Sequence, residues 1–185
     1  MTSKFLVAAG VSLLAASASA QPVGHAAHHP QAETSAMLQT PQSIATEHRE
    51  LHEVLAEATK APGRLGEAAR GLEAALAPHF KREEEIGTPP LSLLDKLAHG
   101  PATAEMRQVL EMTDALEAEL PKMLKEHDGI RAATAAFRAA AVEAKRDEYV
   151  RFADGLAAHA RQEEEILYPA AILVGRYVKA TAPQK

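Results

Sequence analysis

The sequence contains no cysteine and no tryptophan, and aromatic residues make up only 4% of its 185 residues. Without cysteine, neither a disulfide bond nor a lipid attached to a thiol is possible, so the fold must be stabilised by packing or by a bound group. Scarce aromatic residues, together with plentiful alanine, leucine and glutamate, favour helices over sheets. A chain of this length predicts one domain with a substantial core.

Positive charge is also limited, because the formal net charge is −5 and no long basic run occurs. A nucleic-acid-binding domain would require lysine and arginine side chains clustered on one face. We therefore expect no nucleic-acid partner.

The amino terminus resembles an export signal. A short positively charged start, an apolar run too short to span a bilayer, and the small residues "ASA" before Gln21 are typical of a signal peptide over residues 1–20. This pattern predicts cleavage near Gln21, a periplasmic or secreted location, and no membrane attachment of the mature chain. Residues 21–40 lack periodicity and indicate a flexible leader. Three leader histidines either capture metal weakly or belong to an ordinary polar tail: His25, His28 and His29.

The remainder of the chain alternates amphipathic segments with short breaks. This organisation predicts an all-α fold, an antiparallel four-helix bundle over residues 41–180 with a short accessory helix between the second and third helices. The expected helices run from Pro41 to the break at 61–63, over about 64–86, over a short segment ending near Gly100, over about 102–144, and over about 147–179.

Two of the prolines inside these segments bear on the course of the helices. Pro78 should kink the second helix unless neighbouring groups compensate for the lost hydrogen bond, whereas Pro121 leaves open whether the third segment is one kinked helix or two helices. The apolar stripes place Leu124 and Ile166 on faces expected to be buried.

An internal repeat is the most informative feature. "HFKREEEI" begins at His79 and "HARQEEEI" begins at His159, while "TEHREL" and "KEHDGI" carry His48 and His127. His48 and His79 are 31 residues apart, and His127 and His159 are 32 apart. The chain therefore resembles two helical hairpins, each with a histidine on its first helix and a His-x-x-x-Glu motif on its second. Packing alone does not explain a repeat that preserves polar residues at inward-facing positions.

The repeated polar residues predict a metal centre. Residues four apart on a helix differ by about 40° around the axis, so each motif histidine and its glutamate share one face with apolar neighbours. Burying a lone carboxylate there would cost several kcal/mol, which a divalent cation compensates, and imidazole with carboxylate suits iron or zinc. Six ligands exceed the need of one small ion, so two ions bridged by carboxylates fit better. The candidate ligands are His48, His79, Glu83, His127, His159 and Glu163.

Other polar residues flank these positions. His52 shares a helix face with His48 and is a candidate fifth histidine ligand, with a polar residue at the edge of the stripe as the alternative. Glu47 and Glu126 are expected at the surface, with a hydrogen bond to a metal ligand as the alternative. The remaining glutamates of the two triplets are expected to be solvated: Glu84, Glu85, Glu164 and Glu165.

The motifs "EHRELH", "HFKREEE", "EHDGIR" and "HARQEEEILYP" resemble those of the hemerythrin-like (HHE cation-binding) family over about residues 41–179. This resemblance implies a four-helix bundle with a non-haem di-iron centre bridged by oxo or hydroxo. It implies that His48, His79, His127 and His159 are the histidine ligands, and that Glu83 and Glu163 are the bridging carboxylates.

The pattern departs from the oxygen-carrying hemerythrins in two ways. Their third helix has a second histidine where this chain has Arg131, and their last helix has an aspartate five residues after its histidine, where this chain has Glu164. The di-iron proteins that repair nitrosatively damaged iron centres resemble the four-histidine, two-glutamate pattern more closely.

These observations predict an exported di-iron protein that binds a diatomic gas, O₂ or NO, for carriage, sensing or stress protection. A histidine-rich shell is nearly neutral and favours ferrous iron, which supports this function. The alternatives are a di-iron enzyme or repair protein acting in nitrosative or oxidative stress, and an iron storage or delivery protein. The sequence leaves the oligomeric state open.

Overall fold

The computed structural model describes residues 38–184, so the predicted signal peptide and most of the predicted leader lie outside the described residues. Every regular element in residues 38–184 is helical, and this part contains no strand. The elements in chain order are α2 (Gln42–Ala58), α3 (Gly63–Arg82), η1 (Glu83–Gly87), η2 (Pro89–Leu93), α4 (Leu94–His99), η3 (Glu105–Gln108), α5 (Val109–Glu143), α6 (Asp147–Gln162), η4 (Glu163–Leu167) and α7 (Tyr168–Thr181).

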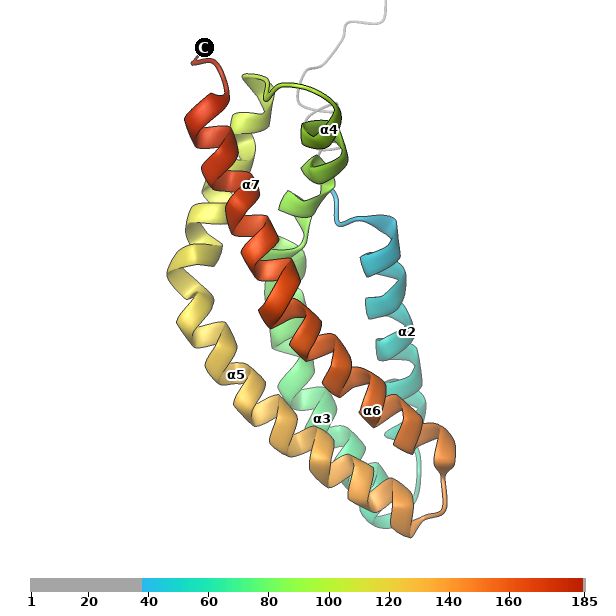
Figure 1. Ribbon diagram of the computed structural model, residues 1–185. Coiled ribbons are helices and arrows are strands. Elements are labelled where there is room, and N and C mark those ends of the chain that lie inside the picture. Colours follow the sequence, from blue (N-terminus) through green and yellow to red (C-terminus); the bar gives the residue numbers. More distant parts are fainter. Residues whose placement is uncertain (1–37, 185) are drawn as a thin grey trace, which may run out of the picture.

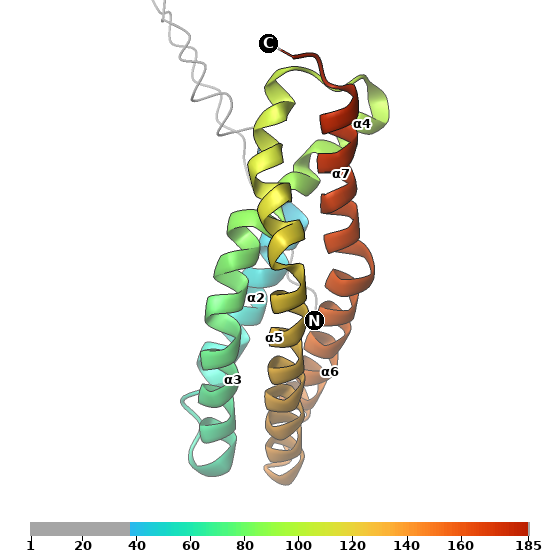
Figure 2. The same ribbon diagram turned by 90° about the vertical axis from the view of Figure 1, so that its left-hand side faces the viewer.

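Four long helical arms form one bundle (Figure 1). They are α2, α3 with η1, α5, and the continuous rod of α6, η4 and α7. Short turns join α2 to α3 and α5 to α6 at one end, so each pair runs in opposite directions, and the segment containing α4 connects the two pairs at the other end (Figures 1 and 2). None of the helices in residues 38–184 combines the length and apolar character that a membrane span needs.

Pro78 and Pro121 are both accommodated within continuous helices. Pro78 lies inside α3, and Pro121 lies inside α5, which continues from Val109 to Glu143. The third segment is therefore one helix that contains Pro121, and not two helices. In Figure 1, α5 changes direction in its yellow section, as expected where proline removes a backbone hydrogen bond.

Two glycines permit close approach between helices. A Cβ atom on Gly66 would lie 1.9 Å from the carbonyl oxygen of Ala61, so only glycine fits beside the turn between α2 and α3. A Cβ atom on Gly175 would lie 2.1 Å from Oγ1 of Thr113, so glycine allows α7 to pack directly on α5.

The apolar core is divided around the repeated histidines. One cluster includes Leu72, Leu76 and Phe137 towards the hairpin turns. A second includes Met123 and Ile172 towards the other end. Because the histidine motifs lie between these clusters along each arm, the polar residues are enclosed by apolar layers and not by solvent.

Two expected core positions are wrong. Leu124 is 36% exposed and Ile166 is 57% exposed. On α5, Met123 lies seven residues after the buried Leu116 and four before the buried His127, so Met123 and not Leu124 faces inward. Ile166 lies in η4, a π-helical turn in which backbone bonds join residues five apart, so the 3.6-residue phase is lost there.

Candidate metal centre

Six of the seven predicted ligands meet in the centre of the bundle. Each is at most 3% exposed. They form two overlapping groups, within each of which one potential ligand atom per residue lies within 4.8 Å of the others. The first group is His79, Glu83, His127 and Glu163, and the second is His48, His159 and Glu163.

His52 is not part of either group. Its side chain is exposed, and its ring meets the edge of Phe80 with the centroids 5.1 Å apart. His48, one turn earlier on α2, is buried, and its ring stacks on that of Phe80 with the centroids 4.6 Å apart. The structure therefore directs only one of the two α2 histidines into the centre.

In the first group, two histidine nitrogens face each other. Nε2 of His79 lies 2.8 Å from Nε2 of His127. Oε1 of Glu83 lies 3.6 Å from Nε2 of His79, and Oε2 of Glu163 lies 3.4 Å from Nε2 of His127. Four potential donor atoms from three different arms thus converge on one small volume.

The second group uses the other oxygen of Glu163. Oε1 of Glu163 lies 2.6 Å from Nε2 of His159 and 3.8 Å from Nε2 of His48. Glu83 is arranged similarly, since its Oε2 lies 4.0 Å from Nε2 of His48 while its Oε1 faces His79. Each carboxylate therefore turns one oxygen towards each group, which is the arrangement required of a bridge between two ions.

A ring of outer glutamates contacts the opposite nitrogens of the histidines. Nδ1 of His79 is 3.1 Å from Glu126, Nδ1 of His127 is 2.6 Å from Glu164, and Nδ1 of His159 is 3.1 Å from Glu47. Nδ1 of His48 is 3.6 Å from Glu84, which is beyond hydrogen-bonding distance.

These contacts decide several expectations about the flanking glutamates. Glu47 and Glu126 lie at the surface as expected, with side chains 46% and 36% exposed, and each also makes the alternative hydrogen bond to a histidine of the site. The expectation that Glu164 is solvated is wrong, because its side chain is only 25% exposed and bonds to His127. Glu85 and Glu165 are exposed, as predicted.

The protonation pattern imposed by these glutamates tests whether the site suits a cation. A carboxylate accepts hydrogen bonds, so each bonded Nδ1 donates its hydrogen, and a neutral imidazole then presents an unprotonated Nε2. For His79 and His127 this places two lone pairs face to face at 2.8 Å, which is repulsive unless positive charge lies between them. Metal-bound histidines have this outer hydrogen bond in most proteins.

Several buried polar atoms have no hydrogen-bond partner within the described residues. Buried polar atoms are almost always satisfied, so a group of unsatisfied ones marks a place for a ligand. Nε2 of His159 and Oε1 of Glu163 are both unsatisfied although they are neighbours. Four of the unsatisfied atoms belong to the two groups: Nε2 of His48, Oε2 of Glu83, Nε2 of His159 and Oε1 of Glu163. The fifth, Nδ1 of His48, faces outward towards Glu84. The donor set therefore fits divalent cations.

The two buried carboxylates also require positive charge. Burial and the neighbouring Glu163 raise the pKa of Glu83 well above its ordinary value. Burial acts in the same direction on Glu163, but close contacts with His127 and His159 outweigh it and hold the pKa of Glu163 low. Two carboxylates at this depth are not stably ionised together without a cation beside them.

The model of the hemerythrin HHE cation binding domain matches residues 40–171. The chain belongs to this family. No curated protein and no solved structure matches the chain. Cation binding by this hemerythrin-like domain agrees with the buried histidine and glutamate groups.

One residue that sequence reasoning missed also lies in the hemerythrin-like centre. Tyr168 is 1% exposed, and its hydroxyl group donates a hydrogen bond to Oε1 of Glu83. On a regular α-helix, Tyr168 would lie about 140° around the axis from Glu163, which would turn it away from the ligands. The π-helical turn η4 changes this phase. The signal available in the sequence was the tyrosine that follows the second glutamate triplet but not the first.

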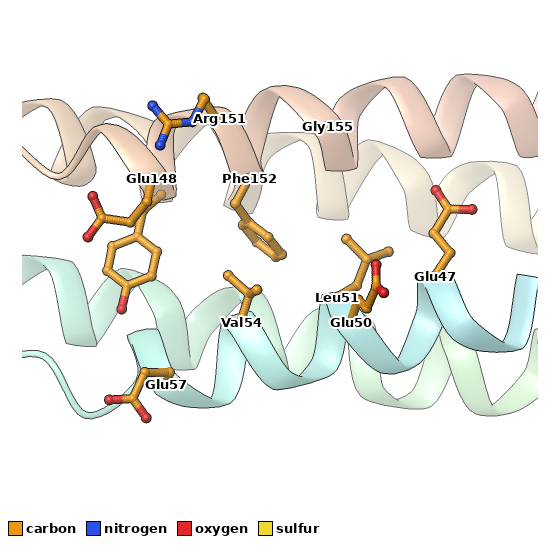
Figure 3. Close-up of a pocket in the computed structure, with 10 residues that line it drawn as sticks. Glu47, Glu50, Leu51, Val54, Glu57, Glu148, Arg151, Phe152 and Gly155 are labelled. Atoms are coloured by element: carbon orange, nitrogen blue, oxygen red, sulfur yellow. The ribbon is translucent and has the colours of Figure 1, made fainter. Parts of the chain in front are cut away.

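A surface groove lies between α2 and α6 of the domain (Figure 3). It has an apolar floor that includes Leu51, Val54 and Phe152, with several glutamates around it. Glu47 stands at one end of the row of labelled residues in Figure 3, and its carboxylate bonds to His159. The groove therefore brings solvent to the outer carboxylate of the second group.

Proposed function

We propose that this domain holds two iron ions and binds a diatomic gas, O₂ or NO, at a coordination position that the protein leaves open. The observation that carries the proposal is the orientation of the Glu163 carboxylate, whose two oxygens face histidines of different groups. A single ion would not require the carboxylate to reach both groups. Bound ferrous iron would supply an open coordination position and electrons to the gas.

The ligand set supports iron as the metal. Four imidazoles and two carboxylates give a nearly neutral shell of intermediate softness, which suits ferrous iron. The outer glutamates fix the orientation of the rings and raise the basicity of the histidines that they contact.

The number of ligands supports gas binding. The first group offers His79, His127 and one oxygen from each glutamate, and the second offers His48, His159 and the remaining oxygens. Because His52 lies outside both groups, neither ion acquires a third histidine, and positions remain for an external ligand.

The test is to purify the mature chain, load it with ferrous iron under anaerobic conditions, and count metal per chain before and after gel filtration. We expect two irons per chain and a change in the visible spectrum on adding O₂ or NO. Only a substoichiometric trace of iron would end the di-iron proposal, whereas two irons with no spectral response would end the proposal of gas binding.

The open positions also favour a second candidate, turnover of nitric oxide or peroxide by the same centre. Many turnovers per chain would support an enzyme, whereas stoichiometric binding alone would support carriage or sensing. Storage is less favoured, because the described residues form two ligand groups, one for each ion of a di-iron centre. We further propose export, on the pattern of residues 1–20, with the amino terminus of the mature chain as the test.

A further inference from the structure

The hydroxyl group of Tyr168 stands among the metal-binding atoms of the first group. Besides its hydrogen bond to Glu83, the oxygen lies 3.4 Å from Nε2 of His79 and 3.4 Å from Nε2 of His127. It thus lies close to three of the four donor residues of that group.

This spacing is close to that expected between ligands of one ion. Donor atoms bonded at about 2.1 Å to one octahedral ion lie about 3 Å from their neighbours. The tyrosine oxygen is near this distance from two histidine nitrogens that are themselves 2.8 Å apart. The phenol ring is held in place by stacking against the ring of His127, with the planes inclined by 24°.

The backbone explains how Tyr168 reaches this position. Its N–H donates to the carbonyl oxygen of Glu163, five residues earlier, and this bond closes the π-helical turn. The turn sets Tyr168 one layer beyond Glu163 on the inward side of the arm. Tyr168 therefore follows its bridging glutamate into the core.

The other half of the repeat has the same backbone but a different side chain. Thr88 occupies the equivalent position, and its N–H donates to the carbonyl oxygen of Glu83 at 2.9 Å. The Thr88 hydroxyl is engaged elsewhere, 2.7 Å from the hydroxyl of Thr40 and 3.3 Å from the carbonyl of Glu83. The second group therefore has no counterpart of the tyrosine oxygen among the described residues.

We propose that the Tyr168 oxygen is a direct ligand of the ion held by His79, Glu83, His127 and Glu163, so that the two iron positions are chemically unequal. The inference rests on the proposed iron binding. As the oxygen–iron bond forms, the phenol O–H bond breaks and its proton leaves to solvent, with no change in oxidation state. Tyrosinate is an established iron ligand in proteins.

The inequality has a consequence for the gas. An additional protein ligand on the first ion leaves fewer free positions there. The ion between His48 and His159 then has more positions for an external ligand, and it lies on the side of Glu47 and the groove in Figure 3.

The experiment uses the mature chain loaded with two irons and oxidised with ferricyanide in the absence of oxygen. A tyrosinate bound to ferric iron gives a charge-transfer band in the visible region, and resonance Raman excitation in that band enhances tyrosine ring vibrations. We expect both signals in the unmodified protein. Tyr168→Phe should abolish them, retain iron in the second group, and weaken iron at the first position by about 10- to 100-fold.

Tyr149→Phe is the matched control, because Tyr149 is also buried but packs against Phe137 in the core cluster near the hairpin turns. It should retain the band. Ring-deuterated tyrosine in the unmodified chain should shift the enhanced vibrations, a readout that does not depend on folding of the variant.

Two irons without a tyrosinate band, or a band unchanged in a folded Tyr168→Phe protein, would overturn the inference and leave the di-iron proposal intact. Failure of the unmodified chain to bind iron would overturn the proposed function, and the tyrosine ligand with it.

Discussion

The two hairpins of the bundle carry the same ligand motif but complete it differently. Each supplies one histidine from its first helix, and a histidine and a glutamate from its second, with the glutamate at the start of a π-helical turn. After that turn the first hairpin places Thr88 against Thr40, whereas the second places Tyr168 against the ligands. The repeat therefore fixes where two cations fit, and the residue after the turn makes their surroundings different.

The outer glutamates show the same combination of symmetry and difference. Glu47 and Glu126 occupy equivalent positions and contact histidines of the opposite hairpin at equal distances of 3.1 Å. Glu84 and Glu164 are also equivalent, but Glu164 is 2.6 Å from its histidine and Glu84 is 3.6 Å from its own. The second hairpin therefore makes a hydrogen bond between its outer glutamate and its first-helix histidine that the first hairpin lacks.

The largest effect should follow from removing Glu163, because it contacts both groups more closely than Glu83 does. We expect Glu163→Ala to lose both irons, and with them the stabilisation by bound metal, about 2.7 kcal/mol when free iron is a hundred times the dissociation constant. Glu83→Ala should lose iron too, though less completely. Metal analysis and thermal melting of the loaded proteins measure both. The exposed Glu165→Ala serves as the control, and full iron content in Glu163→Ala would refute the bridging role.

The next comparison separates the two histidines of α2. His48→Ala should lose the iron of the second group, because it removes one of only two imidazoles there. His52→Ala should retain two irons and cost at most about 1 kcal/mol, because it removes only an edge contact with Phe80. The measurements are iron per chain and urea denaturation. Equal loss of iron in both variants would restore His52 as a ligand.

The sequence predicted most of the helices and most of the candidate ligands. Strong periodicity predicted the long helices, and the repeat identified the six residues that meet in the core. His52 remained ambiguous because a residue four positions from His48 is only about 40° away around a helix. The structure resolves this by turning His48 and Leu55 inward along α2.

The π-helical turns were beyond prediction for a different reason. Their backbone hydrogen bonds join residues five apart, and no local sequence pattern indicates them, since "EEEI" is compatible with an ordinary α-helix in both hairpins. Because the 3.6-residue periodicity was assumed to continue across residues 163–167, Ile166 was expected in the core and Tyr168 was overlooked. The changed phase accounts for the overlooked tyrosine, whereas the exposure of Ile166 also depends on its neighbours, since Ile86 is buried at the equivalent position of η1.

A smaller difference should separate the two outer glutamates of the triplets. Glu164→Gln should lower iron affinity by about 10- to 100-fold, because it removes the charge that orients His127. Glu84→Gln should have little effect, since its side chain is 52% exposed and too distant for a hydrogen bond. Competition with a coloured chelator measures both affinities. Arg131→Ala removes the other partner of Glu164 and controls for loss of that ion pair. If Arg131→Ala lowered iron affinity as much as Glu164→Gln, the effect would be due to the ion pair and not to the contact with His127.

The smallest effect should come from Thr88→Val, the first hairpin's counterpart to Tyr168→Phe. The substitution keeps the shape of the side chain but removes the hydroxyl that bonds to Thr40, at a cost of about 1 kcal/mol. Because this hydroxyl bonds to Thr40 and to the backbone carbonyl of Glu83, and to none of the donor atoms of the two groups, iron content and the visible spectrum should not change. Urea denaturation together with the ferric spectrum checks both parts of the expectation. A loss of iron equal to that of Tyr168→Phe would mean that the residue after each π-helical turn acts through the backbone, and the proposed difference between the two hairpins would then lose its chemical basis.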